Sequence, residues 1–360
     1  MEKKDYILWF CCLEKIGFQK KRKLMEYYHS AENIFKAKEK ELSKLGILEK
    51  KEQEFLLEYQ KEQVIVSLWQ LLKDTKISFC TIDEPQYPYK LLKIYDPPYG
   101  LFYKGKLPNV NQISLAVIGA RACSNYGKEQ SYYFAKQLAE KNVQIISGLA
   151  RGVDGFAHSG AIAATKGKTF AVMGCGVDII YPPEHERLYQ EILLEGGILS
   201  EYPPGTMPYR WNFPQRNRII SGLSNGVLII EARAKSGSLI TADSALEQGR
   251  DVFSLPGRAK DPLSVGTNKL IKQGAELVDS PEDILNFYQI NFTDKIEKKN
   301  LSLARIEEIV YSSLGFEEKH LDRLAEETKL GTGKLMEVLL ELEEKKLVDQ
   351  TGLYFHKILK

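Results

Sequence analysis

Apolar residues recur at different spacings along this chain, and the change of spacing divides it into regions. Over residues 1–75 they return every three to four positions, as in the runs 7–13 and 55–72, which is typical of amphipathic helices. From residue 113 to about 288, short continuous apolar runs alternate with helical segments. Beyond residue 300 the helical spacing returns.

The middle of the chain predicts a parallel sheet covered by helices on both faces, because buried parallel strands are continuously apolar. Strands are expected at residues 115–119, 143–147, 169–174, 198–201, 227–232 and 252–255, with a short one near Leu277. Helices are expected at residues 126–141, 155–166, 183–195, 216–223, 240–249 and 267–274. The pattern therefore indicates an α/β fold with a doubly wound, mostly parallel sheet.

The flanking regions differ from this core. Residues 1–75 predict a small all-α domain. Residues 76–110 are rich in Pro and Tyr, with a short strand at 101–105, and we assign them to the α/β domain as an ordered extension. In the last region, helices at 318–327 and 333–346 precede a possible β-wing, as in a winged helix. The expected parts are domains at 1–75, 76–290 and 300–360 and a polar linker at 291–299.

Composition and charge exclude several classes of protein. The chain has 50 Lys and Arg against 48 Asp and Glu, a formal net charge of +2, so it is not a polybasic protein that holds nucleic acid by overall charge. No apolar run approaches the roughly 20 residues that a membrane helix needs, and no signal peptide is evident. The five cysteines include no C-x-x-C pair, and the histidines are scattered. We expect a soluble cytoplasmic protein with no metal site and no membrane partner.

Basic residues cluster where the predicted strands end, which is where ligands bind in open α/β sheets. The basic residues at these ends are Arg121, Arg151, Arg216, Arg218, Arg233, Lys235 and Arg258. The acidic residues there are Asp154, Asp178, Glu201 and Glu231. Glycine-rich turns and helix N-termini beside arginines suit phosphate groups. The pattern predicts a basic rim, although Arg121 or Arg151 could instead form structural pairs with Asp154 or Glu231.

The segment 212–218 adds an aromatic ring to this chemistry. Phe213 could stack on a base. Arg216 and Arg218 are two positions apart, so a regular helix cannot direct both side chains to one point.

Taken together and in this order, the motifs resemble those of the DprA/Smf family of DNA-processing proteins. The matching runs are AVIGARACSNYG (116–127), ISGLARGVDGFAH (146–158), TFAVMGCGVD (169–178), LSEYPPGT (199–206), NFPQRNRIISGLS (212–224), EARAKSGSLITA (231–242), VFSLPG (252–257), GTN (266–268) and QGA (273–275). One departure is Ala120, where the family more often has Thr.

The resemblance implies an extended Rossmann-like domain that binds single-stranded DNA, usually as a homodimer. It implies an N-terminal helical domain of the SAM or helix-hairpin-helix kind and a C-terminal winged-helix-like domain. It also implies a mediator, without catalysis or cofactor, that protects incoming DNA and loads RecA onto it in natural transformation, with single-strand-binding protein as a further partner. Carried over by motif, the DNA-binding residues are Arg121, Ser147, Gly148, Arg151, Phe213, Arg216, Asn217, Arg218, Lys235 and Ser236.

Two other hypotheses stay open at the level of sequence. The turn at 236–241 is similar to the phosphate loop of lysine-decarboxylase-like phosphoribohydrolases, which would make the protein a nucleotide-binding or nucleoside-monophosphate-hydrolysing enzyme. Ser244 stands where that family has its Glu, which counts against hydrolysis. The winged-helix-like region could read duplex DNA, but its 9 basic and 12 acidic residues favour a contact with protein.

Overall fold

The computed structural model describes residues 1–290, 305–314, 319–345 and 347–357. The chain forms two compact units, Met1–Leu285 and Asn286–Lys360. The linker predicted at 291–299 lies outside the described residues.

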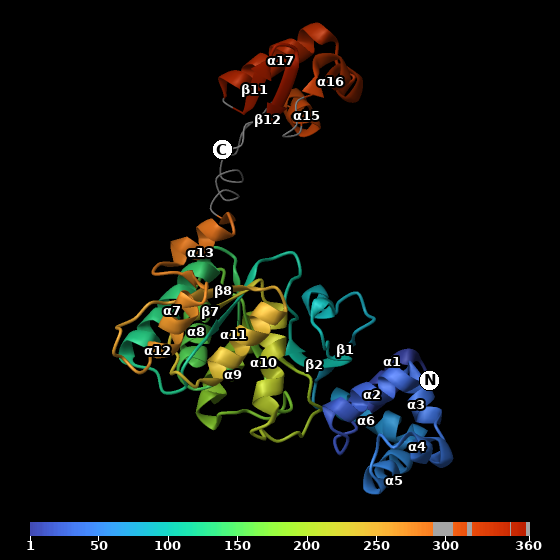
Figure 1. The fold of residues 1–360 in the computed structure, drawn as a ribbon. Coiled ribbons are helices and arrows are strands. Elements are labelled where there is room, and N and C mark those ends of the chain that lie inside the picture. The colour runs from blue at the N-terminus through green and yellow to red at the C-terminus, as the bar shows by residue number, and fades with distance from the viewer. Residues whose placement is uncertain (291–304, 315–318, 346, 358–360) are drawn as a thin grey trace. The chain divides into compact units, whose positions relative to one another are not determined.

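A nine-stranded sheet within the described residues is the centre of the first unit, in the order β1-β2-β6-β5-β4-β3-β7-β8-β9 (Figure 1). β2 is antiparallel to both of its neighbours, and the other pairings are parallel. The strands are β1 (Ser78–Thr81), β2 (Gly100–Gly105), β3 (Ser114–Ile118), β4 (Gln144–Ser147), β5 (Thr169–Val172), β6 (Gly197–Ser200), β7 (Gly226–Ile229), β8 (Asp251–Ser254) and β9 (Glu276–Leu277).

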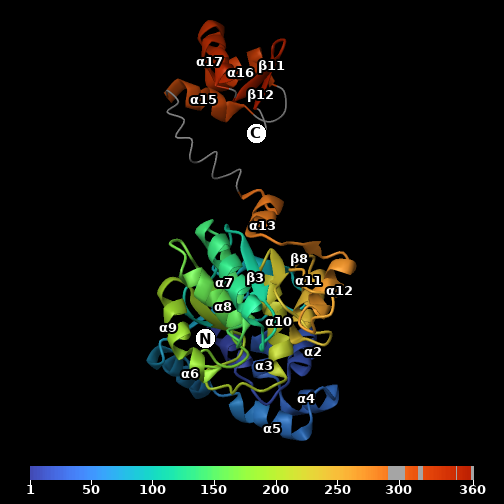
Figure 2. The same ribbon diagram turned by 90° about the vertical axis from the view of Figure 1, so that its left-hand side faces the viewer.

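Helices cover both faces of the sheet, as the continuous apolar strands predict (Figure 2). On one face lie α7 (Asn125–Glu140), α8 (Val153–Ile162) and α9 (Glu186–Glu195), the last preceded by η2 (Pro183–His185). On the other lie α10 (Asn212–Leu223), α11 (Gly237–Glu247), α12 (Val265–Lys272) and η1 (Tyr89–Lys93). The doubly wound α/β fold is thereby confirmed.

The sequence prediction contains neither η1 nor α13 (Pro281–Phe287), and it differs from the structure at two further elements of the first unit, β1 and α10. The strand β1 was not expected, because its four residues follow a helix directly and precede a Pro-rich stretch; pairing with β2 stabilises it. The helix α10 begins at Asn212 rather than Arg216. Pro214 does not stop it, since a proline in the first helical turn removes no backbone hydrogen bond that the helix would make.

The N-terminal region is all α, as predicted. Its helices are α1 (Lys3–Cys11), α2 (Phe18–Tyr28), α3 (Ala31–Lys36), α4 (Glu39–Leu45), α5 (Lys50–Tyr59) and α6 (Glu62–Asp74). Ser30 caps α3 by accepting a hydrogen bond of 3.1 Å from the Asn33 amide. The run of helical spacing at 55–72 is divided between α5 and α6.

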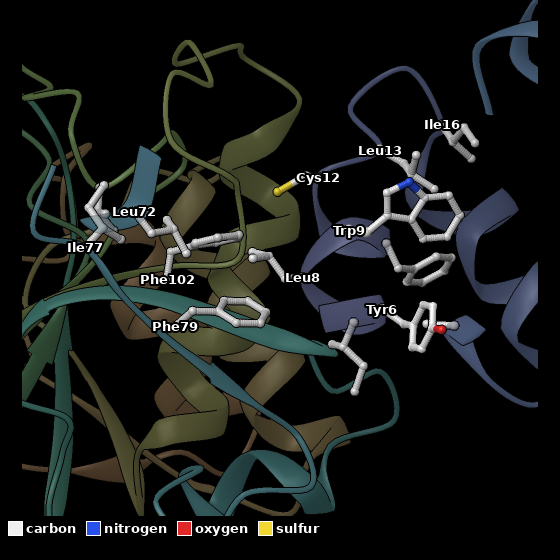
Figure 3. Packing of buried hydrophobic residues seen from close by; sticks show 14 of the residues in the cluster. Tyr6, Leu8, Trp9, Cys12, Leu13, Ile16, Leu72, Ile77, Phe79 and Phe102 are labelled. Carbon is white, nitrogen blue, oxygen red and sulfur yellow. The ribbon is translucent and has the colours of Figure 1, made fainter. Parts of the chain in front are cut away.

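These helices share a hydrophobic core with the β1–β2 edge of the sheet (Figure 3). Leu8 of α1 and Leu72 of α6 lie near Phe79 and Phe102, and the two phenyl rings have centroids 4.8 Å apart. The region that the sequence places in a separate domain therefore belongs to the same compact unit as the sheet.

The second unit contains α15 (Arg305–Ser313), α16 (Leu321–Thr328) and α17 (Thr332–Glu344). Its sheet has the order β10-β12-β11, formed by β10 (Lys319–His320), β11 (Val348–Thr351) and β12 (Tyr354–Lys357). Leu324, Leu339 and Phe355 are fully buried in its core. Two helices joined by a short turn and followed by a hairpin are the winged-helix arrangement that the sequence predicts. The helix α13 (Pro281–Phe287) follows β9 in the chain, and the first unit ends within it at Leu285.

Candidate nucleic-acid interface

A groove of about 650 Å³ opens at the carboxyl ends of β3 and β7, where the strand order reverses direction. Its walls are the turns after these strands, the start of α10 and the start of α11. Asp154 is the single carboxylate among the described residues that line it. The basic lining residues are Arg121, Arg210, Arg216, Arg233 and Lys235. Five cations against one anion give the groove a positive potential in a chain that is nearly neutral overall.

Arg216 lies beneath the groove and is only 3% exposed. Its Nη1 donates a hydrogen bond of 2.9 Å to the Gly148 carbonyl, and it also donates to the Val172 carbonyl. Burial lowers the pKa of Arg216 to about 10, with Asp154 acting in the opposite direction. The guanidinium therefore stays charged at neutral pH and joins the ends of β4 and β5.

Asp154 is the buried anion that accompanies this cation. Its Oδ2 accepts a hydrogen bond of 3.1 Å from the Gly148 amide. Burial raises the pKa of Asp154, and the Arg216 charge acts against that rise. A Cβ on Gly148 would lie 2.6 Å from Arg216 Nη2 and 2.8 Å from Asp154 Oδ2, so any other residue there would displace these two side chains.

Phe213 places an aromatic face at the groove between two arginines. Its ring centroid lies 5.1 Å from the Arg121 guanidinium and 5.7 Å from that of Arg216. The Tyr181 ring is 5.6 Å away, tilted by 42°. A half-buried ring beside an exposed cation can stack on a base while the cation binds the adjoining phosphate.

The N-terminus of α11 forms the opposite wall. Ser236 caps this helix, and its Oγ lies 2.7 Å from Ser238 Oγ. Asn217 reaches across from α10 and donates a 3.4 Å hydrogen bond to the Gly237 carbonyl. Lys235 is exposed directly before the cap. Amides at a helix start, hydroxyls and a lysine are groups that bind phosphate oxygens.

The N-terminus of α7 differs from that of α11, because a carboxylate of the chain binds its first residues. The buried Glu231 accepts hydrogen bonds of 2.8 Å from the Ser124 amide and 2.5 Å from the Ser124 hydroxyl, at the start of α7. In dinucleotide-binding Rossmann folds the cofactor pyrophosphate occupies this position. A carboxylate of the chain itself therefore fills the place that such an anion would take.

Comparison with known proteins decides the family. A family model described as DNA recombination-mediator protein A matches residues 78–289, more than half of the chain, and a model of the DprA winged helix domain matches residues 297–352. The chain belongs to the DprA/Smf family. The resemblance drawn from the motifs is confirmed.

Among DprA/Smf relatives, Protein Smf of Escherichia coli is 47% identical over 228 residues, which cover 60% of this chain and 61% of that protein. DNA processing protein DprA of Bacillus subtilis is 45% identical over 213 residues, 59% of this chain and 71% of that protein. The similarity to the E. coli relative thus spans less than two thirds of its length.

Two solved DprA structures share the fold. The X-ray structure of DprA from Streptococcus pneumoniae matches with a TM-score of 0.58 and 40% identity, covering 65% of this chain and 81% of that one. A Helicobacter pylori structure, whose title concerns the single-stranded DNA binding mode of DprA, matches with a TM-score of 0.54 and 32% identity, covering 60% of this chain and 98% of that one.

The structure gathers six of the ten residues predicted from the DprA/Smf motifs along the groove lining. These six are Arg121, Phe213, Arg216, Asn217, Lys235 and Ser236. Gly148 lies directly beneath them, against Arg216. Contact between any of the ten and DNA stays a prediction.

The other three predicted residues lie elsewhere. Ser147 is fully buried and donates a 2.7 Å hydrogen bond to the Val117 carbonyl. Arg151 is exposed and pairs with Glu184. Arg218 points away from the groove and pairs with Glu201 at 2.7 Å and Asp96 at 3.2 Å. Helix geometry explains the last case, since residues two apart face different sides.

Two groove arginines were absent from the predicted set. The sequence pattern places Arg233 on the basic rim but not among the DNA-binding residues, and it does not single out Arg210. Arg210 belongs to the loop before α10 rather than to a strand end, so the strand-end rule could not find it. Its position between Tyr209 and Trp211 is the signal in the sequence that could have found it.

The described residues hold no group of three or more His, Cys, Asp or Glu side chains arranged to bind a metal ion. Likewise, none of the helices in this part of the chain combines the length and apolar character that crossing a bilayer requires.

Proposed function

We propose that the chain binds single-stranded DNA in the groove between the ends of β3 and β7. The observation that carries this proposal is the groove lining of five cations, one buried carboxylate and the Phe213 ring. Cations bind the phosphates without regard to sequence, and an aromatic face binds any unpaired base. The matched H. pylori structure, titled for its single-stranded DNA binding, supports the proposal.

The proposal is tested by titrating labelled single-stranded and duplex oligonucleotides at several salt concentrations. Single strands are expected to bind more tightly, with an affinity that falls steeply as salt rises. Arg121→Ala combined with Lys235→Ala should weaken binding at least tenfold and reduce the salt dependence, since two phosphate contacts are lost.

Arg187→Ala is the matched control, because this arginine's side chain is 91% exposed on α9 and its ion pair is with Glu191 of the same helix. It should leave the affinity unchanged. Equal affinities for single strand and duplex, or a double variant that binds as well as Arg187→Ala, would overturn the proposal.

We extend the proposal to the step that the DprA/Smf resemblance implies, in which a homodimer of this non-catalytic protein protects incoming DNA and passes it to RecA. The test is RecA strand exchange on DNA coated with single-strand-binding protein. Adding the protein should stimulate exchange, and the Arg121→Ala, Lys235→Ala variant should not. An absence of stimulation would overturn the proposed transfer of DNA to RecA and leave the DNA-binding proposal in place.

The enzymatic alternative has less support in the groove. Hydrolysis of a nucleoside monophosphate needs a carboxylate that can exchange a proton with the substrate. Among the described lining residues the candidate is Asp154, and Gly148 and Arg216 hold it below the surface. Release of free base from nucleoside monophosphates by the purified protein would reverse this conclusion.

A further inference from the structure

A single loop separates the groove from a second cavity. Residues of the loop before α10 alternate between the two sides: Pro208 and Arg210 line the groove, whereas Tyr209 and Trp211 line the second cavity. This cavity has a volume of about 390 Å³, within the range of roughly 300–1,000 Å³ that is usual for sites of small organic ligands.

The N-terminal helices supply the far wall of this cavity. Phe10, Phe18 and Lys21 lie on that side, and Tyr202 and Gln215 lie on the side of the α/β domain. Lys21 donates a 2.9 Å hydrogen bond to the Cys11 carbonyl, so its ammonium is held in place. The Tyr202 hydroxyl lies 3.3 Å from Gln215 Oε1. Six of the described residues that line this aromatic cavity carry aromatic rings, and its charged lining residues are Glu14, Lys15, Lys21 and Glu201.

The mouth of the cavity carries an exposed pair of stacked rings. The Tyr209 and Trp211 ring centroids lie 4.9 Å apart with an interplanar angle of 5°, and these residues are 48% and 66% exposed. The other tryptophans differ, since Trp9 is fully buried and Trp69 donates a hydrogen bond to Asp5. Two large parallel rings left facing water beside a cavity indicate a flat ligand that stacks on them.

We propose that the DNA strand leaves the groove across Arg210, that one of its bases stacks on Trp211, and that the aromatic cavity receives this unpaired base. The proposal rests on single-stranded DNA binding in the groove. Arg210 lies between the two rings in sequence and on the groove side of the loop, so a phosphate bound to it places the next base at the Tyr209–Trp211 pair.

This arrangement adds to the preference for unpaired bases that the Phe213 ring gives the groove. Cations bind the phosphates of single strands and of duplexes alike. A stacking site that encloses a base accepts one only when it is unpaired, because a paired base must first leave the duplex at a cost of a few kcal/mol. Trp211 and its cavity are therefore specificity-determining parts of the binding site.

The test uses the full chain and a poly-dT oligonucleotide long enough to pass beyond the groove. Tryptophan fluorescence should be quenched on binding, and Trp211→Phe should abolish the quenching while keeping the affinity within about threefold, because a smaller ring still stacks. Trp211→Ala should lower the affinity about tenfold, as expected for the loss of one base stack. The Trp211→Ala variant should also have a smaller ratio of single-strand affinity to duplex affinity than the wild type.

Two controls make the result specific. Tyr133→Ala removes a ring of similar exposure, 45%, on α7, and it should have no effect since Tyr133 lines neither cavity. An abasic oligonucleotide of the same length keeps the phosphates and should bind wild type and Trp211→Ala equally.

These measurements distinguish a failure of the base-binding cavity from a failure of the groove proposal. If wild-type protein binds single strands with steep salt dependence but shows no quenching and no loss in Trp211→Ala, the base-binding cavity is wrong and the groove proposal stands. If wild-type protein binds single strands no better than duplexes, both proposals are overturned.

Discussion

At the scale of single residues, the arginines of the groove divide into two kinds. Arg121 is exposed and makes no ion pair among the described residues, so its charge is available to a ligand. Arg216 is buried and bound to two carbonyls and beside a buried acid, so it supports the groove from below. Loss of DNA binding on replacing Arg216 would therefore not distinguish contact from support.

A stability measurement does distinguish them. Arg216→Met should lower the free energy of unfolding by about 3 kcal/mol, because it leaves the Asp154 carboxylate buried without its cation. Adding Asp154→Asn removes that charge and should recover part of the loss. Chemical denaturation of Arg216→Met, Asp154→Asn and the double variant completes a double-mutant cycle. A double variant no more stable than Arg216→Met would show that the two side chains are not coupled.

The buried His158 makes stability depend on pH. Its Nδ1 lies 2.6 Å from Thr169 Oγ1, and the Thr169 hydroxyl donates to the Ile145 carbonyl, so Nδ1 carries the imidazole proton and donates to Thr169. The buried Nε2 has no hydrogen-bond partner within the described part of the chain. Burial lowers the pKa of His158 to about 3, so the folded protein keeps the ring neutral over most of the acidic range.

The unfolded chain takes up this proton near pH 6.5 and the folded chain only near pH 3, so stability must fall as pH decreases between these values. Between pH 7 and pH 5 the loss from this residue is about 2 kcal/mol. His158→Gln cannot titrate and should show a correspondingly smaller loss over that interval in denaturation at both pH values. An identical pH dependence in the variant would contradict this account.

At the scale of elements, the turns after β3 and β4 hold each other in position. Gly152 starts α8 with φ of 75°, and a Cβ there would lie 2.3 Å from the Ala120 carbonyl oxygen and 2.4 Å from that of Arg121. Only glycine allows both the positive φ and this approach. The backbone that carries Arg121 into the groove is thus set by the neighbouring turn.

Gly152→Ala should destabilise the protein by about 1–3 kcal/mol through this strained conformation. It should also weaken DNA binding, because the Arg121 turn has to move. Thermal unfolding and oligonucleotide titration measure the two effects. Gly333→Ala is the control, since a Cβ at Gly333 meets nothing within 4 Å and this residue lines neither the groove nor the second cavity. Unchanged DNA affinity in Gly152→Ala would show that the turn does not position Arg121.

At the scale of the whole molecule, charge is distributed unevenly between the two units. The groove lies in Met1–Leu285 and gathers cations, whereas α17 of the second unit carries Glu337, Glu341, Glu343 and Glu344. Only Glu337 of these four forms an ion pair among the described residues, with Lys334 at 2.8 Å. An acidic helix is repelled by phosphates, so the second unit is unsuited to strengthen DNA binding by charge.

The fragment 1–290 should therefore keep the single-strand affinity of the full chain within about threefold, with the same salt dependence. Titration of both proteins under identical conditions measures this. A drop of tenfold or more in the fragment would assign a DNA contact to the second unit.

The sequence by itself determined the layers and the place of the site. Apolar runs and helical spacing are local patterns, and the end of a parallel strand is a defined position along the chain, so the strand-end residues Arg121 and Lys235 could be found. Tertiary structure decided the direction of each side chain. The rotation of α10 turns Arg216 towards the groove and Arg218 towards Glu201, and burial converts Ser147 into a support of the sheet.

Tertiary structure alone also brought the N-terminal helices against the sheet. The hydrophobic core that contains Leu8, Phe79 and Phe102, like the cavity behind Trp211, joins residues far apart in the chain. No spacing rule links such residues, because they meet only where folding removes apolar surface from water. Local patterning thus specified the elements and their chemistry, and packing specified which of these residues line the groove.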